Sequence, residues 1–225
     1  MHPILHCLIL AGISLIPLSI DLFHPTFPDY FKYLIIIIAF SLTFILYYYQ
    51  FYKPFIKKRG DYLDLLISEL LSVFDINIRR AMPQINNLRM SIMIVRKNYY
   101  RPWEHYLMID YYYPKDSFKA SELELIFANN VGCCGTALFE NEQIVYDSIL
   151  SHETLKGMTE IQKDITKNIK SILSTPIYSP NEWQRAPIAI LNIDSMDNIL
   201  TTGFNDSVIQ EIAANRAALI GGLLI

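Results

Sequence analysis

Residues 186–194 read APIAILNID, and this stretch is apolar without interruption from Ala186 to Leu191. A strand that is apolar on both faces is typical of the interior of a sheet covered on both sides. We therefore predict that this segment is the central strand of a sheet. The preceding apolar run, Ser171–Tyr178, predicts its neighbour, and Asp206 is placed to cap a final helix that continues to Leu224. The residues of this helix expected to face inward are Val208, Ile209, Ile212, Ala213, Ala217 and Ile220.

Apolar spacing predicts the elements upstream of this strand. After Asp61, leucine, isoleucine and phenylalanine residues recur every three or four positions up to Phe74, which indicates a helix. The strands are expected at 89–96, 105–113, 121–127, 143–147, 171–178 and 186–194. A tight turn at 132–135 should precede a short helix, and the polar stretch 148–170 should be a long loop with one or two short helices. The order predicts an α+β domain with one antiparallel sheet and flanking helices.

Charge is distributed very unevenly along the 225 residues, of which 52% are hydrophobic and 18% charged. Residues 1–52 contain three charged side chains, whereas residues 53–225 hold 18 basic and 20 acidic ones. This balance argues against a nucleic-acid-binding surface. Three cysteines, Cys7, Cys133 and Cys134, are too few for a disulfide framework or a four-ligand zinc site.

The first 52 residues are expected to form a membrane hairpin. Spans of about 4–20 and 31–52 have the length and the apolar character of transmembrane helices. Basic residues in the link 53–61 place that end in the cytoplasm by the positive-inside rule. The chain would then be a two-pass inner-membrane protein, with both termini and the domain 62–225 cytoplasmic. A cleaved signal peptide is the alternative, but it lacks a positive N-terminal region. The hairpin could serve as an anchor or assemble with others into a pore.

Four motifs occur in an order that resembles a GAF domain over residues 62–224. They are GCCGTAL at 132–138, IVYD at 144–147, SILSTPIY at 171–178 and PIAILNIDS at 187–195. The resemblance implies a small-molecule sensor and dimerisation module. It also implies that the ligand lies between the sheet and the loop 148–170.

Within that family, Cys134–Ala137 and Asn192–Ser195 are most similar to free methionine-R-sulfoxide reductase, an enzyme that needs an attacking cysteine and a resolving cysteine. Cys134 matches the resolving position, but Gly157 and Met158 stand where the attacking cysteine is expected, and no cysteine follows Cys134. The resemblance also implies acidic residues where this chain has Ile172 and Asn192, so that Asp194 alone remains. We therefore predict no reductase activity and no catalytic residue.

Candidate ligand-binding residues follow from their positions at strand ends and in the long loop. They are Tyr111, Thr136, Asp147, His152, Lys156, Thr159, Lys170, Asp194 and Ser195. Asp194 and Ser195 could instead form a turn at the end of their strand. His152 could simply be solvated, and Lys156 and Lys170 could belong to a solvated charged face.

The function expected from these features is that of a membrane-anchored cytoplasmic sensor. It would bind a small molecule, with nucleotides among the candidates, and signal to a partner protein. Dimerisation or higher assembly is expected through the first and last helices of the domain, with no cofactor and no metal. Two alternatives remain open: a ligand-gated membrane effector that forms pores or disrupts the bilayer, and a divergent reductase-like enzyme.

Overall fold

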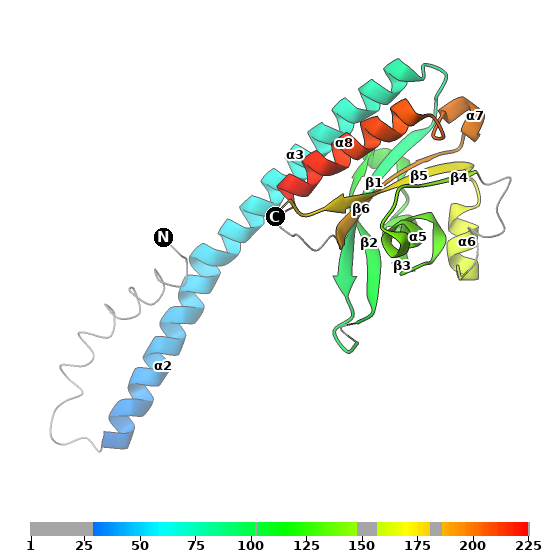
Figure 1. The fold of residues 1–225 in the computed structure, drawn as a ribbon. Coiled ribbons are helices and arrows are strands. Elements are labelled where there is room, and N and C mark those ends of the chain that lie inside the picture. The colour runs from blue at the N-terminus through cyan, green and yellow to red at the C-terminus, as the bar shows by residue number, and fades with distance from the viewer. Residues whose placement is uncertain (1–28, 102, 148–156, 181–185, 225) are drawn as a thin grey trace. The chain divides into compact units, whose positions relative to one another are not determined.

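The computed structural model describes residues 29–101, 103–147, 157–180 and 186–224 (Figure 1). The chain divides into two compact units, Met1–Leu63 and Asp64–Ile225. Each unit is described separately below.

In the first unit, helix α2 (Asp29–Tyr47) passes into a π-helical turn, η1 (Tyr48–Tyr52), and then into helix α3 (Lys53–Ala81). The residues of α3 from Asp64 onward belong to the second unit. The π turn explains how Pro54 is tolerated. Proline lacks the N–H that an α-helix requires, and wider turns of this kind absorb such a break. The N–H of Lys53 accordingly bonds to the carbonyl of Tyr48, five residues back. Residues 53–61, predicted to be a basic link, form the first turns of α3.

The predicted membrane spans receive no support from the structure. Among the helices that the structure describes, none combines the length and the apolar character needed to cross a bilayer. The span predicted at 31–52 is thus not confirmed. The span predicted at 4–20 lies outside the described residues.

The second unit is built on a six-stranded antiparallel sheet with the order β3-β2-β1-β6-β5-β4. The strands are β1 (Leu88–Lys97), β2 (His105–Tyr113), β3 (Ile126–Ala128), β4 (Ile144–Asp147), β5 (Ser171–Tyr178) and β6 (Pro187–Ser195). Strand β6 pairs with β1 on one side and with β5 on the other. Ala189, Ile190, Leu191 and Ile193 are completely buried. The prediction of an apolar central strand is therefore confirmed.

Helices cover both faces of this sheet (Figure 1). The helices α3 and α8 (Ser207–Leu223) lie side by side on one face, with Asn77 and Arg80 of α3 beside Ile212 and Leu219 of α8. The other face carries α5 (Gly132–Glu140) and α6 (Glu160–Thr166). Three short helices complete the unit: η2 (Lys115–Ser117), α4 (Ala120–Leu123) and α7 (Ile199–Thr202).

Two expectations about local structure are wrong. The segment predicted as a strand at 121–127 begins as helix α4, and only its end forms β3. Glu122 explains this, because its carboxylate accepts the N–H of Lys119 at 3.1 Å and also binds Arg89. These two interactions of Glu122, a local cap and a long-range ion pair, thus stabilise a helix where the alternation of apolar residues predicted a strand. In addition, α5 begins at Gly132 itself (φ 66°), where a tight turn extending to 135 was predicted.

The last helix is largely as predicted. Asp206 caps it, since its Oδ1 accepts the N–H of Val208 at 2.8 Å. Ile209, Ala213, Ala217 and Ile220 are buried, as expected. Val208 is 56% exposed, so its inward orientation was predicted wrongly. It precedes Ile209, the first buried residue of the inward stripe, and is rotated by about 100° from it around the helix axis.

The cap of α8 gives a first testable prediction. Replacing Asp206 by alanine leaves the first turn of α8 without a side-chain acceptor and should lower the free energy of unfolding by about 1 kcal/mol. Asp206→Asn should retain most of the stability, because asparagine also accepts a hydrogen bond at this position. Urea unfolding of the three proteins measures the difference. Equal losses in both variants would show that the charge, and not the hydrogen bond, stabilises the helix.

Candidate functional site

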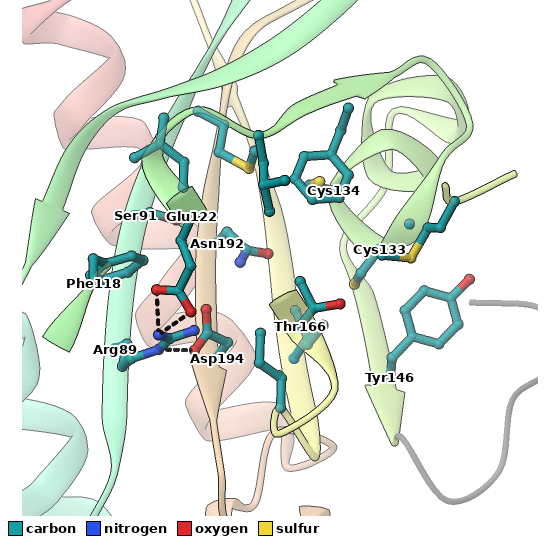
Figure 2. Close-up of a pocket in the computed structure, with 18 of the residues that line it drawn as sticks. Arg89, Ser91, Phe118, Glu122, Cys133, Cys134, Tyr146, Thr166, Asn192 and Asp194 are labelled. Atoms are coloured by element: carbon teal, nitrogen blue, oxygen red, sulfur yellow. Dashed lines mark hydrogen bonds and ion pairs between the residues drawn. The ribbon is translucent and has the colours of Figure 1, made fainter. Parts of the chain in front are cut away.

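A cavity of about 420 Å³ lies on the sheet face that carries α5 and α6 (Figure 2). Alternate residues of the central strands form its floor, because successive side chains of a strand point to opposite faces. Its remaining walls are mainly apolar and include Ile109, Phe118, Leu125, Phe127 and Met158. An apolar cavity with a few polar groups is typical of small-molecule sites.

A buried ion cluster occupies one end of the cavity. Arg89 of β1 and Asp194 of β6 are cross-strand partners, and Arg89 Nε donates to Asp194 Oδ1 at 2.7 Å. Arg89 Nη1 donates to Glu122 Oε2 at 3.0 Å and to the Ser117 carbonyl at 3.1 Å. The guanidinium also lies 4.6 Å from the ring centre of Phe118. Figure 2 shows Arg89 between the two carboxylates. One cation thus serves two acids.

Burial and pairing act against each other in this cluster. Arg89 is 6% exposed and Asp194 is 3% exposed. Burial raises the pKa of the Asp194 carboxyl, and the nearby Arg89 pulls that pKa back only in part. Burial also opposes the charge on Arg89, but attraction and hydrogen bonds from Asp194 and Glu122 outweigh it and raise the pKa of Arg89. Arg89 is therefore a permanent cation that pairs with both Asp194 and Glu122.

A row of uncharged polar residues crosses the floor next to the ion cluster. Asn192 of β6 pairs in register with Ser91 of β1 and with Ser174 of β5. Ser174 Oγ donates to Asn192 Oδ1 at 2.6 Å. Ser91 and Asn192 line the cavity. The floor therefore offers hydrogen-bonding groups in two adjacent rows, one charged and one neutral.

The two adjacent cysteines lie at the opposite end of the cavity, near Tyr146 (Figure 2). Cys133 and Cys134 are free thiols that are 3% and 5% exposed. Burial raises the pKa of Cys134 to about 12, and burial raises the pKa of Cys133 further still. Both remain protonated at neutral pH. A protonated thiol is a poor nucleophile, so neither cysteine is prepared for attack on a substrate.

Thiol labelling checks this description. In a Cys7→Ser background, both remaining thiols should react with a thiolate-specific reagent about a thousandfold more slowly in native protein at pH 8 than in urea, because their raised pKa values suppress the thiolate. The slow reaction should persist as the pH rises to about 10, which lies below the pKa of about 12 for Cys134. Fast labelling of one thiol in native protein would contradict the assigned burial.

The structure brings two of the predicted ligand-binding residues together at the cavity. Lys170 and Asp194 line it. Five other candidates do not line it in the described part of the chain: Tyr111, Thr136, Asp147, Thr159 and Ser195. His152 and Lys156 lie outside the described residues.

Some of these candidates have evident structural roles. The Thr136 hydroxyl donates to the carbonyl of Gly132 within α5, at 2.8 Å. Thr159 caps α6, since its hydroxyl accepts the N–H of Gln162 at 3.2 Å. Ser195 accepts the N–H of Asp197 at 3.0 Å, which matches the turn considered as its alternative role. Tyr111 lies on β2, where burial raises its pKa. Asp147 is the last residue of β4.

Lysines follow the edge of the cavity on α6 and just after it. Lys163 pairs with Glu160 and Lys167 pairs with Asp164, each at 2.8 Å. These two ion pairs are exposed, as in the solvated charged face that the sequence indicates as the alternative role of the lysines. Lys170 has no side-chain partner among the described residues. It is the lysine of this group best placed to meet an anionic part of a ligand.

Four polar residues of the site were not among the candidates selected from the sequence: Arg89, Ser91, Glu122 and Asn192. A signal for Arg89 was present, because an arginine in an otherwise apolar strand must find a carboxylate when it is buried. The partner could not be named without the fold, since Glu122 and Asp194 are 33 and 105 residues away. No three His, Cys, Asp or Glu side chains of the described residues are placed to hold a metal ion.

Comparison with known proteins relates the fold to solved structures. No protein-family model matches the chain, and no curated protein sequence is detectably similar to it. Type II free methionine-R-sulfoxide reductase from Thermoplasma acidophilum is 12% identical and has a TM-score of 0.50, over 74% of this chain and 94% of that one. The free methionine-R-sulfoxide reductase of Staphylococcus aureus in complex with substrate is 18% identical, with a TM-score of 0.43 over 62% of this chain and 74% of that one.

A GAF domain from the Acinetobacter phosphoenolpyruvate-protein phosphotransferase is also similar. It is 11% identical, with a TM-score of 0.47 over 74% of this chain and 81% of that one. At these identities the comparison concerns the fold alone. The second unit has a GAF-like fold, with a six-stranded antiparallel sheet and helices on both faces, and the fold predicted from the four motifs is confirmed.

Proposed function

We propose that this chain is a sensor whose second unit binds a small molecule in the cavity above β1 and β6. The observation that carries the proposal is an apolar cavity of about 420 Å³ with a polar floor of Arg89, Ser91, Asn192 and Asp194. Polar groups are expensive to bury unless they are paired, so a row of them facing an apolar cavity favours a ligand that completes their hydrogen bonds.

The proposal excludes sulfoxide reduction. That chemistry requires an accessible thiolate and a second thiol to resolve it. The chain has no cysteine after Cys134, and burial raises the pKa of both Cys133 and Cys134. Thiol-dependent turnover of free methionine sulfoxide that is lost in Cys134→Ser would overturn this part of the proposal.

Location at a membrane and self-association complete the proposal. The membrane location rests on the sequence of residues 1–52, in which three side chains are charged. The apolar residues Leu65, Val73 and Ile76 of α3 are each about half exposed and could pack against a second copy. In this arrangement the first unit anchors the chain, and the ligand-bound second unit signals to a partner protein. Nucleotides remain among the candidate ligands.

A membrane effector is the second candidate function, favoured by the scarcity of charge in residues 1–52. Expression of the full chain should separate the two. A sensor leaves the membrane potential of the cells unchanged, whereas an effector dissipates it when its ligand is present. An effector should also lose this activity when residues 1–52 are deleted.

Thermal unfolding of the full chain against a panel of metabolites tests ligand binding. At a ligand concentration of 100 times Kd, the stabilisation should reach about 2.7 kcal/mol. Ser91→Leu, which extends a side chain into the cavity, should abolish the shift while the chain stays folded. A shift of equal size in Ser91→Leu would place the ligand elsewhere.

A further inference from the structure

The cavity floor carries several polar atoms without a partner among the described residues. The bonds of Arg89 use Nε and Nη1, which leaves Nη2, and the bond of Asp194 uses Oδ1, which leaves Oδ2. Asn192 accepts through Oδ1, which leaves its Nδ2 group, and the Ser91 hydroxyl has no partner. No fully enclosed side-chain nitrogen or oxygen of the described residues lacks a hydrogen bond. These four atoms are therefore accessible, and the cavity lined by their residues is the space open to them.

Two of these atoms are a donor and an acceptor on side chains that are bonded to each other. The bond between Arg89 Nε and Asp194 Oδ1 holds the two side chains together at 2.7 Å. Glu122 and the Ser117 carbonyl hold the guanidinium from its other side. Arg89 Nη2 can only donate, and Asp194 Oδ2 accepts while the carboxyl is ionised. This end of the cavity thus presents one donor and one acceptor on a rigid, ion-paired support.

We propose that the cavity selects a ligand with an uncharged amide or lactam edge. Its C=O would accept from Arg89 Nη2, and its N–H would donate to Asp194 Oδ2. The neighbouring Ser91 hydroxyl and Asn192 amide would bind further polar atoms of the same ligand, while the apolar walls cover its body. This inference rests on the proposed function, because it names the class of ligand for the same cavity.

Charge explains why a cationic ligand is disfavoured. An unpaired buried aspartate would attract an ammonium group, but Arg89 Nε lies 2.7 Å from Asp194 Oδ1 and offsets the charge of that carboxylate in part, because the same guanidinium also pairs with Glu122. An ammonium group at Asp194 would also stand beside a buried guanidinium, and like charges in a low dielectric repel strongly. A bare carboxylate ligand would meet Glu122 and Asp194 at the same end. A neutral group that both donates and accepts avoids both conflicts.

Matched fragments test the inference on the full chain in lipid nanodiscs, with binding read by saturation-transfer NMR. The fragments are 2-pyridone and benzamide, which carry the C=O and N–H pair, and N-methyl-2-pyridone and benzylamine, which do not. Asp194→Asn replaces an accepting oxygen while Glu122 still holds Arg89. Asp197→Asn is the matched control, because Asp197 accepts the N–H groups of Asn86 and Asn87 and does not line the cavity. Subtracting the signal of Ser91→Leu, whose cavity is filled, removes fragment partition into lipid.

We expect 2-pyridone and benzamide to bind about tenfold more tightly than their matched partners, since a buried acceptor left unpaired costs that much. Asp194→Asn should remove the preference, and Asp197→Asn should preserve it. Stronger binding of benzylamine, equal binding of all four fragments, or an unchanged preference in Asp194→Asn would each overturn the inference. If no fragment binds while a metabolite still shifts the thermal unfolding of the chain, the inference fails and the proposed function stands. If nothing shifts it, the proposed function fails.

Discussion

Arg89→Met should lower the free energy of unfolding by about 3–5 kcal/mol. The substitution keeps an unbranched apolar stem but removes the guanidinium, the only cation paired with Asp194 and Glu122 among the described residues. Asp194 is 3% exposed, so its carboxylate cannot recover solvation when the guanidinium is lost. A buried Asp194 and a partly buried Glu122 without a counter-charge should make this position one of the least tolerant in the chain. Urea unfolding, followed by near-ultraviolet circular dichroism, measures the loss.

The same strand offers a matched control. Arg96 of β1 pairs with Asp110 at 2.6 Å, but the two side chains are 49% and 28% exposed. A pair this accessible contributes little after solvent screening, so Arg96→Met should cost at most about 1 kcal/mol. Equal losses for Arg89→Met and Arg96→Met would show that burial of the ion cluster does not determine its contribution. Arg89→Lys should fall between them, because lysine restores the charge without the planar fork that reaches both acids.

Gly221→Ala should lower the free energy of unfolding by about 1–3 kcal/mol. Helix α8 approaches strand β5 so closely at this residue that an added Cβ would lie 2.3 Å from the backbone oxygen of Tyr178. A backbone atom cannot rotate away as a side chain can, so the helix must shift and loosen its packing on the sheet. The loss should appear in urea unfolding as a lower midpoint with an unchanged slope.

The adjacent glycine is the control. At Gly222 an added Cβ meets nothing within 4 Å. Gly222→Ala should therefore raise the stability by about 0.5–1 kcal/mol, because alanine favours the helical backbone more than glycine does. If both substitutions raise the stability, helix propensity and not the contact with Tyr178 dominates at this end of α8. If both lower it, the open space at Gly222 does not determine the effect of an added Cβ there.

Much of the fold could be predicted from the sequence where a local pattern and its burial agree. The apolar run of β6 identified the central strand, and Asp206 identified the start of α8. Prediction failed where a distant partner decided the local structure. The helix at Ala120–Leu123 depends on Glu122, whose carboxylate binds Arg89 on another strand. Prediction also failed at Pro54, for a local reason. Pro54 lies inside a long helix because a π turn precedes it, and no propensity scale indicates such a turn.

The candidate site was harder to predict, since its residues meet only in the folded sheet. Asp194 was identified by its place at the end of a strand, but its pairing with Arg89 depends on the register of β1 against β6. Ser91 and Asn192 face each other for the same reason. Positions in a loop or at a strand end were used to select Thr136 and Thr159, and their hydroxyl groups bond within or at the start of their own helices. Register, and not residue type, determines which polar groups reach the cavity.

Native mass spectrometry of the full chain, purified gently from its source cells, tests the central claim most directly. The wild-type chain should carry a bound small molecule in part of the population, and Ser91→Leu, which fills the cavity, should carry none. Release of that compound should lower the unfolding temperature of the wild type to that of the empty protein. A wild-type chain that is always empty and that no metabolite stabilises would contradict the account, as would a compound bound equally by Ser91→Leu.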